Sequence, residues 1–199
     1  MKDFANTIIR LQAKYTADWH DNPATPLPTE TDLHRLVIEQ HQQNFDLWHE
    51  EDKAREPGAA DEIIAQVKRK IDSLNQRRND LITEIDIHLA EHDLAAYQND
   101  LLPWNSETLG SIIDRLSIAS LKVYHMAEQT ERTDVSQQHI QNCLKKLHQL
   151  KLQEQDLGTS LQAFVNDIVA GNKQNKLYRQ FKMYNDPNLN PKIYNKKAG

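Results

Sequence analysis

Glycine and cysteine are scarce in this 199-residue chain, and each scarcity excludes a class of protein. The chain has five glycines and one cysteine, Cys143. The glycines do not form the glycine-rich loop that holds nucleotide phosphates, nor the glycine pattern around a nucleophilic serine. A single cysteine forms no intrachain disulfide and supplies at most one ligand to a cysteine-based zinc site. We therefore expect a cytoplasmic protein without these types of site.

Long apolar runs and strand-like patterns are also absent. No segment reaches the length of about 18 apolar residues that a membrane-spanning helix needs, and the start of the chain lacks the apolar core of a signal peptide. Alternation of apolar and polar residues, typical of strands, is not found. The few glycines and prolines cluster between long windows without helix breakers. The sequence therefore predicts an all-α protein with no membrane span.

Apolar residues at helical spacing divide the chain into about five helices. A first helix over 4–19 is followed by a proline-rich linker at 21–30. Further helices are expected from Thr29 or Thr31 to before Pro57, over 60–92, from a cap near Asn105–Glu107, and from a cap at Asp134 to 171, with a kink at Gly158. We predict one elongated bundle domain, residues 1–171, followed by a C-terminal extension, residues 172–199.

The C-terminal extension is basic and aromatic, whereas the body is acidic. Residues 172–199 have a net charge of +6, and the rest of the chain has −11. Basic and aromatic residues together are typical of nucleic-acid binding, but the acidic body favours docking of the tail on its own bundle or on a second subunit. We expect nucleic acid to be an unlikely partner. The residues concerned are Lys173, Lys176, Tyr178, Arg179, Phe181, Lys182, Tyr184, Lys192 and Tyr194.

Several charged residues interrupt otherwise regular apolar faces. Arg78 lies within the apolar seam of the helix expected over 60–92, and a buried guanidinium needs a carboxylate or a phosphate partner. If Arg78 pairs with Asp114 or Glu51, the pair is a structural lock between helices. If several of these charged side chains converge, they form a binding site. The two interpretations are compatible. The candidate ligand-binding residues are His49, Arg55, Arg78, Asp80, Asp114, Arg115, Lys122 and His125.

A metal-dependent enzyme is the alternative interpretation. Two helices that each present a pair of acids are a known way to bind Mg²⁺ or Mn²⁺ and a diphosphate. Glu51 and Asp52 form one pair, and Glu84 and Asp86 form the other. This set predicts a hydrolase or transferase acting on a nucleotide or sugar diphosphate, although acid-rich helix faces are more often only solvated.

Histidines are a weaker signal for a transition-metal site or a general base. His88 and His92 lie four residues apart on one helical face, but Leu89 occupies the position where a zinc-protease helix has its acid. His49 and His125 are further candidates as ligands. From spacing alone, we expect most of these histidines to be surface or helix-end groups.

Four motifs in order resemble the bacterial family numbered 4254 among domains of unknown function. The motifs are Trp48-His49-x-Glu51-Asp52-x-x-Arg55, Arg78-x-Asp80 with Glu84-x-Asp86, Asp114-Arg115-Leu116-Ser117-Ile118 with Tyr124-His125-Met126, and Arg179-Gln180-Phe181-Lys182-Met183-Tyr184-Asn185-Asp186. The resemblance covers nearly the whole chain and implies a fold but no reaction. It also implies a genomic association with envelope glycosyltransferases, and hence a binding or accessory protein of envelope glycan synthesis with a glycosyltransferase partner. Long helices with a free apolar face predict a dimer.

Overall fold

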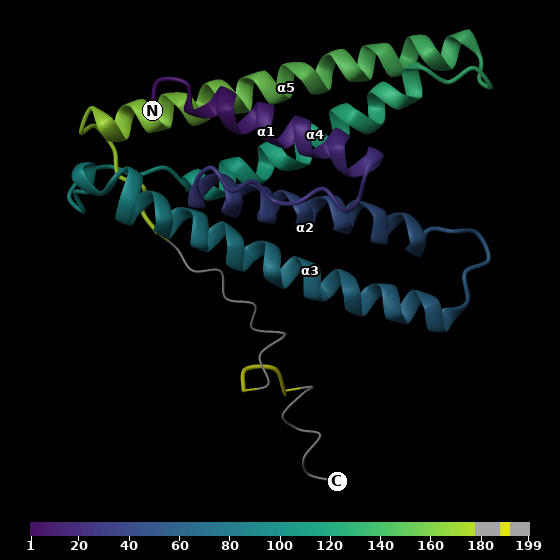
Figure 1. Cartoon of the computed structure of the whole chain (residues 1–199), viewed down its shortest axis with the longest axis horizontal. Helices are drawn as coiled ribbons and strands as arrows, with labels where there is room; N and C mark the ends of the chain where they lie inside the picture. Colours follow the sequence, from purple (N-terminus) through teal and green to yellow (C-terminus); the bar gives the residue numbers. More distant parts are fainter. Residues whose placement is uncertain (178–187, 192–199) are drawn as a thin grey trace.

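The computed structural model describes residues 1–177 and 188–191, and its five long helices form an all-α bundle (Figure 1). None of the helices in this part of the chain is long and apolar enough to cross a membrane. Within the same residues, β pairing is limited to an isolated bridge between Trp104 and Gln174. The predicted all-α class is therefore confirmed. The helices are α1 (Phe4–Asp21), α2 (Asp32–Ala54), α3 (Asp61–His88), α4 (Leu109–Thr130) and α5 (Gln137–Val169), with a π-helical turn, Leu89–Asp93, and a 3-10 turn, Ala95–Tyr97, after α3.

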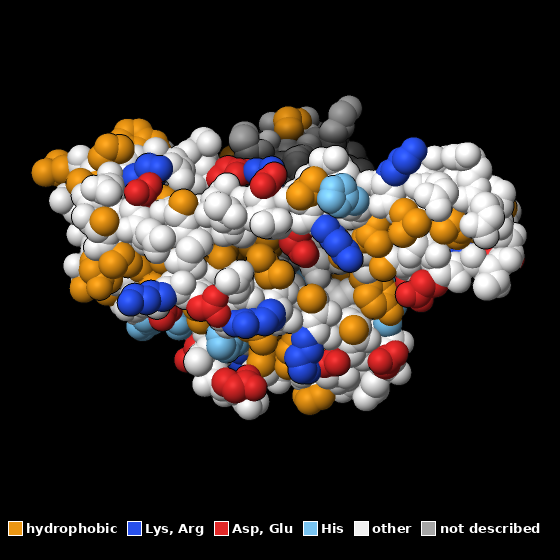
Figure 2. All heavy atoms as spheres, turned by 90° about the horizontal axis from the view of Figure 1, so that it is seen from above, with side chains coloured by type: hydrophobic (Ala, Val, Ile, Leu, Met, Phe, Trp, Pro, Cys, Tyr) orange, Lys and Arg blue, Asp and Glu red, His pale blue; other side chains and the backbone are white. Residues whose placement is uncertain are grey.

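The helices are arranged as two antiparallel pairs with α1 between them. α2 packs along α3, and α4 packs along α5 (Figure 1). α1 contacts α4, α2 and α5, and α4 in turn contacts both α2 and α3. Helix α4 is therefore the element that meets every other helix of the bundle. On the face shown in Figure 2, basic and acidic side chains are intermixed, and hydrophobic side chains are visible between them.

Short side chains cap three of the helices. Thr31, Thr108 and Ser136 accept hydrogen bonds from the backbone N–H three residues later, at 3.1, 3.1 and 3.2 Å. The caps expected for α4 near Asn105–Glu107 and for α5 at Asp134 were wrong, because the helices begin slightly later. Asp134 instead forms an ion pair with Arg132 at 2.7 Å, so its carboxylate is already engaged outside the helix.

The hydrophobic core lies where α1 crosses the two pairs. Trp19 of α1 is 2% exposed, and residues of all five helices contribute to the same buried cluster. The seam predicted on α3 is confirmed for most of its length, since Val67, Ile71, Leu74, Leu81 and Ile85 are buried. Burial of this seam stabilises the α3 contacts with α2 and α4, at about 25 cal/mol per Å² of apolar surface.

Residues just after α5 dock on the bundle. Gln174 N–H donates to the Pro103 carbonyl at 2.9 Å, and the Lys173 ammonium pairs with Asp167 at 3.0 Å. Lys176 lies over the Trp104 ring, 4.0 Å from its centroid. The predicted docking of the tail on its own bundle is thus present for residues 173–176. Tyr178, Arg179, Phe181, Lys182, Tyr184, Lys192 and Tyr194 lie outside the described residues.

Two helical glycines mark close approaches between helices. A Cβ at Gly110 of α4 would lie 2.6 Å from the Ile82 carbonyl oxygen and 2.9 Å from Asp86 Oδ2. A Cβ at Gly158 would lie 2.7 Å from Ile9 Cδ1. Gly158 does not end α5, which continues through it for roughly 50 Å at 1.5 Å per residue. Its lack of a side chain allows the close approach of Ile9 from α1, and the kink expected at this glycine stays a prediction.

These contacts predict opposite outcomes for two alanine substitutions. Gly110→Ala should lower the free energy of unfolding by about 1–3 kcal/mol, because backbone atoms of α3 cannot move away from the new methyl group. Gly158→Ala is the matched control and should be close to neutral, because the end of the flexible Ile9 side chain can move and alanine favours the helix. Urea denaturation measures both. Equal stability of the two variants would contradict this account of Gly110.

Candidate functional site

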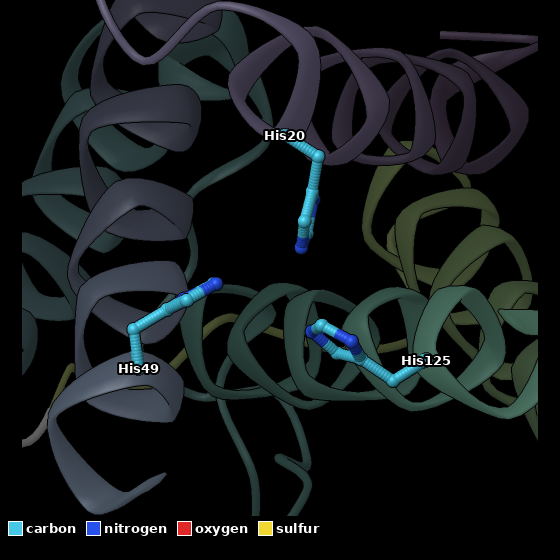
Figure 3. Close-up of side chains that lie close together, drawn as sticks. All are labelled: His20, His49 and His125. Atoms are coloured by element: carbon cyan, nitrogen blue, oxygen red, sulfur yellow. The ribbon is translucent and has the colours of Figure 1, made fainter. Parts of the chain in front are cut away.

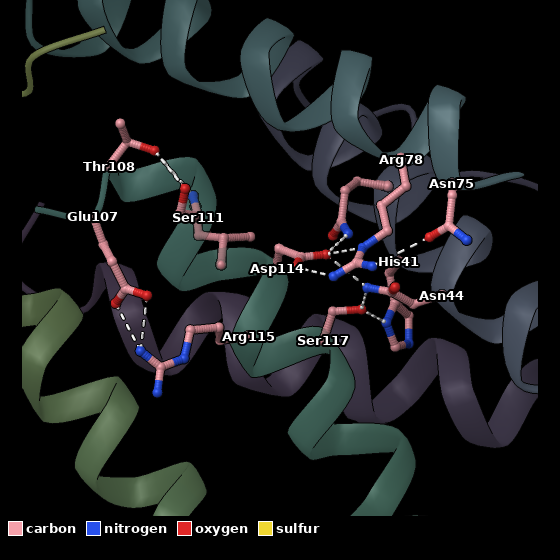
Figure 4. A network of polar contacts seen from close by, with 12 residues as sticks. His41, Asn44, Asn75, Arg78, Glu107, Thr108, Ser111, Asp114, Arg115 and Ser117 are labelled. Atoms are coloured by element: carbon pink, nitrogen blue, oxygen red, sulfur yellow. Dashed lines mark hydrogen bonds and ion pairs between the residues drawn. The ribbon is translucent and has the colours of Figure 1, made fainter. Parts of the chain in front are cut away.

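An ion pair joins Arg78 of α3 to Asp114 of α4 (Figure 4). Arg78 Nε donates to Asp114 Oδ1 at 2.7 Å, and Nη2 donates to Oδ2 at 2.5 Å. The two side chains are 23% and 8% exposed. The hydrogen bond to Asp114 raises the pKa of Arg78 above its ordinary value. The pairing predicted for Arg78 is confirmed with Asp114, whereas Glu51 pairs with Arg55 at 2.7 Å.

Helix α2 completes the hydrogen bonding of the buried carboxylate. Gln40 Nε2 and Asn44 Nδ2 both donate to Asp114 Oδ1, at 2.6 and 3.0 Å. With the two bonds from Arg78, the carboxylate accepts four hydrogen bonds from two helices. A buried charge is tolerated when it is paired and fully hydrogen-bonded. We call Arg78, Asp114, Gln40 and Asn44 the polar lock.

A chain of hydrogen bonds extends the polar lock to α1. Asn44 also donates to Ser117 Oγ at 2.8 Å, and Ser117 Oγ lies 2.7 Å from His41 Nδ1. His41 Nε2 lies 2.9 Å from Thr16 Oγ1, whose hydroxyl donates to the Gln12 carbonyl. All these bonds form together when the His41 proton is on Nε2 and Ser117 donates to Nδ1. Burial lowers the pKa of His41 to about 3, so the ring is neutral at physiological pH.

A pocket of about 450 Å³ opens beside the polar lock, between α2, α3 and α4. Four of the predicted residues meet there: Glu51, Asp52, Arg55 and Arg78. Arg55 is paired with Glu51, and the Asp52 carboxylate has no hydrogen bond or ion pair with any described residue. The remaining lining combines an aromatic ring, two amides and aliphatic side chains: Asn44, Leu47, Trp48, Asn75, Ile118 and Leu121.

Three other predicted residues lie away from this pocket. Asp80 accepts a hydrogen bond from Gln76 at an exposed position of α3. Arg115 pairs with Glu107 at 2.7 Å and, with Lys122, lines a separate groove between α4 and α5. Adjacent residues of a helix point about 100° apart, and here the Asp114 side chain is 8% exposed while that of Arg115 is 53% exposed. The eight candidate residues therefore do not form one site.

The four predicted carboxylate ligands are not brought together. Glu51 and Asp52 line the pocket, while Glu84 pairs with Arg77 at 2.5 Å. Asp86 of α3 is buried against the start of α4. Its carboxylate accepts hydrogen bonds from the Gly110 N–H and from Asn175 at 2.8 and 3.1 Å. Burial raises the pKa of Asp86, and these hydrogen bonds oppose the rise. Ligands of Mg²⁺ or Mn²⁺ must surround the ion at about 2.1 Å, and in the described part of the chain these four acids do not.

Two further candidates, His49 and His125, meet His20 at a junction of α1, α2 and α4 (Figure 3). One nitrogen of each ring lies within 4.8 Å of the others. Burial lowers the pKa of His125, and its hydrogen bond with Glu128 partly opposes this effect. Sequence reasoning missed His20. The sequence did contain a signal for it, because Gln12, Thr16 and His20 follow one another every four residues and so lie on one face of α1.

The polar residues of α2 were also missed, although the sequence contained a signal for them. Leu33, Val37, Gln40, Asn44 and Leu47 alternate four and three apart, which is the spacing of a buried seam. Two amides inside such a seam must find hydrogen-bond partners. Their spacing predicts burial, but it does not identify the carboxylate that they contact on α4.

Removing one partner of the buried ion pair should cost more stability than removing an exposed one. We expect Arg78→Met to lower the free energy of unfolding by about 3 kcal/mol, because Asp114 is left buried without its cation. Adding Asp114→Asn should recover part of this loss by removing the charge. Arg115→Met, which breaks an exposed pair, is the control and should cost less than about 1 kcal/mol. Denaturant unfolding of all four proteins measures the effect, and no recovery in the double variant would contradict it.

His41 should make stability depend on pH. The unfolded chain binds a proton at this residue below its ordinary pKa of 6.5, whereas the folded protein does not do so until about 3. Its contribution is therefore complete above pH 6.5 and is lost as pH falls, by about 1.4 kcal/mol per pH unit. His41→Gln should flatten the dependence between pH 6 and 4, and the exposed-site variant His148→Gln should not. Parallel curves for wild type and His41→Gln would refute this assignment.

Comparison with known proteins identifies a family for this chain. No curated protein and no solved structure matches it significantly. A family model described as "Protein of unknown function (DUF4254)" matches residues 34–177. The matched range runs from the first turn of α2 beyond the end of α5 and includes the whole polar lock. The chain therefore belongs to the DUF4254 family of proteins of unknown function.

Proposed function

We propose that this protein binds a sugar-containing ligand in the pocket beside the polar lock and acts as a binding or accessory protein in envelope glycan synthesis. One observation supports this proposal above others. The pocket combines the Trp48 ring, the Asp52 carboxylate and the Asn75 amide in a volume of about 450 Å³. This volume lies in the range of small-molecule sites, which pair apolar walls with a few polar groups that orient the ligand.

The charges around the pocket favour a hydroxyl-rich ligand over a diphosphate. Arg78 is neutralised by Asp114, and Arg55 by Glu51. The charged group of the lining left without a partner among the described residues is the Asp52 carboxylate, which accepts hydrogen bonds from hydroxyl groups and repels phosphate. A diphosphate site would instead need unpaired cations or a metal ion.

Trp48 provides a rigid wall for a sugar ring. Its indole stacks on the His125 ring, with centroids 4.5 Å apart and an interplanar angle of 9°. This contact fixes the orientation of the indole. Aromatic faces present a broad apolar surface at little entropic cost, and such a surface fits the C–H face of a pyranose. The polar lock next to the pocket holds α2, α3 and α4 in register. The pocket is therefore formed before a ligand binds.

The alternative function, a divalent-metal hydrolase or transferase acting on a nucleotide or sugar diphosphate, receives less support from this geometry. Its four carboxylate ligands are divided between the pocket, the Arg77 pair and the buried start of α4. A glycosyltransferase partner and a dimer stay predictions from the sequence.

The binding proposal is tested by titrating the protein with neutral monosaccharides, their phosphates and nucleotide sugars. We expect a sugar to bind and to change the intrinsic tryptophan fluorescence, to which Trp48 contributes with Trp19 and Trp104. Asp52→Asn should weaken binding about tenfold through the loss of a charge-assisted hydrogen bond. Arg115→Ala in the separate α4–α5 groove is the matched control and should bind as wild type does. Calorimetry gives the affinities, and thermal melts confirm that the variants are folded.

Two outcomes would overturn the proposal. One is tighter binding of inorganic diphosphate than of any sugar, unaffected by Asp52→Asn, which would favour the enzyme interpretation. The other is sugar binding that is lost in Arg115→Ala but kept in Asp52→Asn, which would place the site in the other groove.

A further inference from the structure

Three histidines from three helices converge away from the polar lock. His20 projects from α1, His49 from α2 and His125 from α4, and the rings point toward a common space (Figure 3). One nitrogen of each ring lies within 4.8 Å of the other two. Among the described residues, these three histidines are the group of metal-ligating side chains that could hold one ion.

The hydrogen bonding of the three rings leaves the same atom free in each. Nδ1 of His20 and of His49 faces the backbone carbonyl four residues earlier, at 2.7 and 2.8 Å. Nδ1 of His125 faces the Glu128 carboxylate at 2.7 Å. An N–H at Nδ1 donates to each of these acceptors, so Nε2 is left with its lone pair. Histidines that bind metals are oriented in this way by a carbonyl or carboxylate behind the ring.

Two of these Nε2 atoms are buried without any partner in the described residues. They belong to His20 and His125. A buried nitrogen without a hydrogen bond is costly, so each such atom in a folded protein needs an explanation. Aromatic stacking accounts for the ring planes, since His20 stacks on Tyr124 with centroids 4.1 Å apart, but it provides no partner for the lone pairs.

We infer that His20, His49 and His125 form a binding site for a divalent transition-metal ion of the Zn²⁺ class. The ion accepts the lone pairs of the three Nε2 atoms and so satisfies the two that are buried. Neutral imidazole suits Zn²⁺ and its transition-metal neighbours, whereas Mg²⁺ and Ca²⁺ require oxygen ligands. Three protein ligands leave a fourth tetrahedral position for a water molecule or an incoming ligand.

The dimensions of the cluster fit this ion after a small closing movement. Zn–N bonds of about 2.0–2.1 Å place tetrahedral ligands roughly 3.4 Å apart, within the 4.8 Å limit that one nitrogen of each ring already meets. Rotation of the rings about their side-chain bonds supplies the difference. Aromatic rings of Phe45, Trp48 and Tyr124 surround the histidines and give the apolar shell that limits water access around a metal.

The location of the site gives it a structural consequence. The polar lock joins α3 and α4 to α2, while the three histidines join α1 to α2 and α4. Bound metal would therefore stabilise the position of the C-terminal end of α1, where α1 leads into the segment before α2. The inference does not depend on the sugar-binding proposal, because no histidine of the cluster lines that pocket.

The experiment is a metal titration of the intact protein, stripped of metal with a chelator. We expect Zn²⁺ to bind at one ion per chain by calorimetry and to raise the melting temperature, and Mg²⁺ to do neither. Co²⁺ should give the intense visible absorption of a tetrahedral site. The His49→Ala variant should lose this absorption and bind Zn²⁺ more than tenfold more weakly.

A second variant and a matched control keep the test decisive if His49→Ala unfolds. Glu128→Ala changes an exposed side chain that only orients His125, and it should weaken Zn²⁺ binding about tenfold. His92→Ala is the control, because His92 and His88 form a separate histidine pair with ring centroids 4.7 Å apart. The inference would be overturned if the wild type did not bind Zn²⁺. It would also be overturned if Zn²⁺ binding were unchanged in both His49→Ala and Glu128→Ala, or were lost in His92→Ala.

Discussion

The buried carboxylate of Asp114 is the constraint on which the rest of the bundle depends. A charge at this depth is stable only when its partners are placed together, and here they come from two other helices: Arg78 from α3, and Gln40 and Asn44 from α2. Apolar contacts alone tolerate sliding of one helix along another. Four directional hydrogen bonds to one carboxylate do not, so the ion pair fixes the register of α2, α3 and α4.

Helix α2 connects the polar features because its successive faces meet different neighbours. Its inner seam provides Gln40 and Asn44 to the polar lock, and its last turns present Trp48 and Asp52 to the pocket. His49 lies on the face toward α1, where it meets His20 and His125. The proposed sugar pocket and the proposed metal site thus lie on either side of one helix, with the Trp48–His125 stack between them.

The sequence predicted much of the fold and only part of the candidate site. Helical spacing and the positions of proline and glycine predicted the five helices. Arg78 within an apolar seam indicated an ion pair with Asp114 or Glu51, and the structure selects Asp114. The four carboxylates and the eight candidate residues were grouped by charge, and the structure separates them. Arg115 and Lys122 face the α4–α5 groove, and Asp86 holds the start of α4. Charge alone does not reveal which face of a helix meets which neighbour.

The sequence by itself determined the elements: which segments are helical, where they stop, and which of their faces are apolar. These properties depend on local backbone preferences and on periodicity within one helix. The tertiary structure decided which polar groups meet, because that depends on the register and crossing of separate helices. His20 and His125 are more than a hundred residues apart, yet their rings lie 5.0 Å apart. Only the packing of α1 across α2 and α4 brings them together.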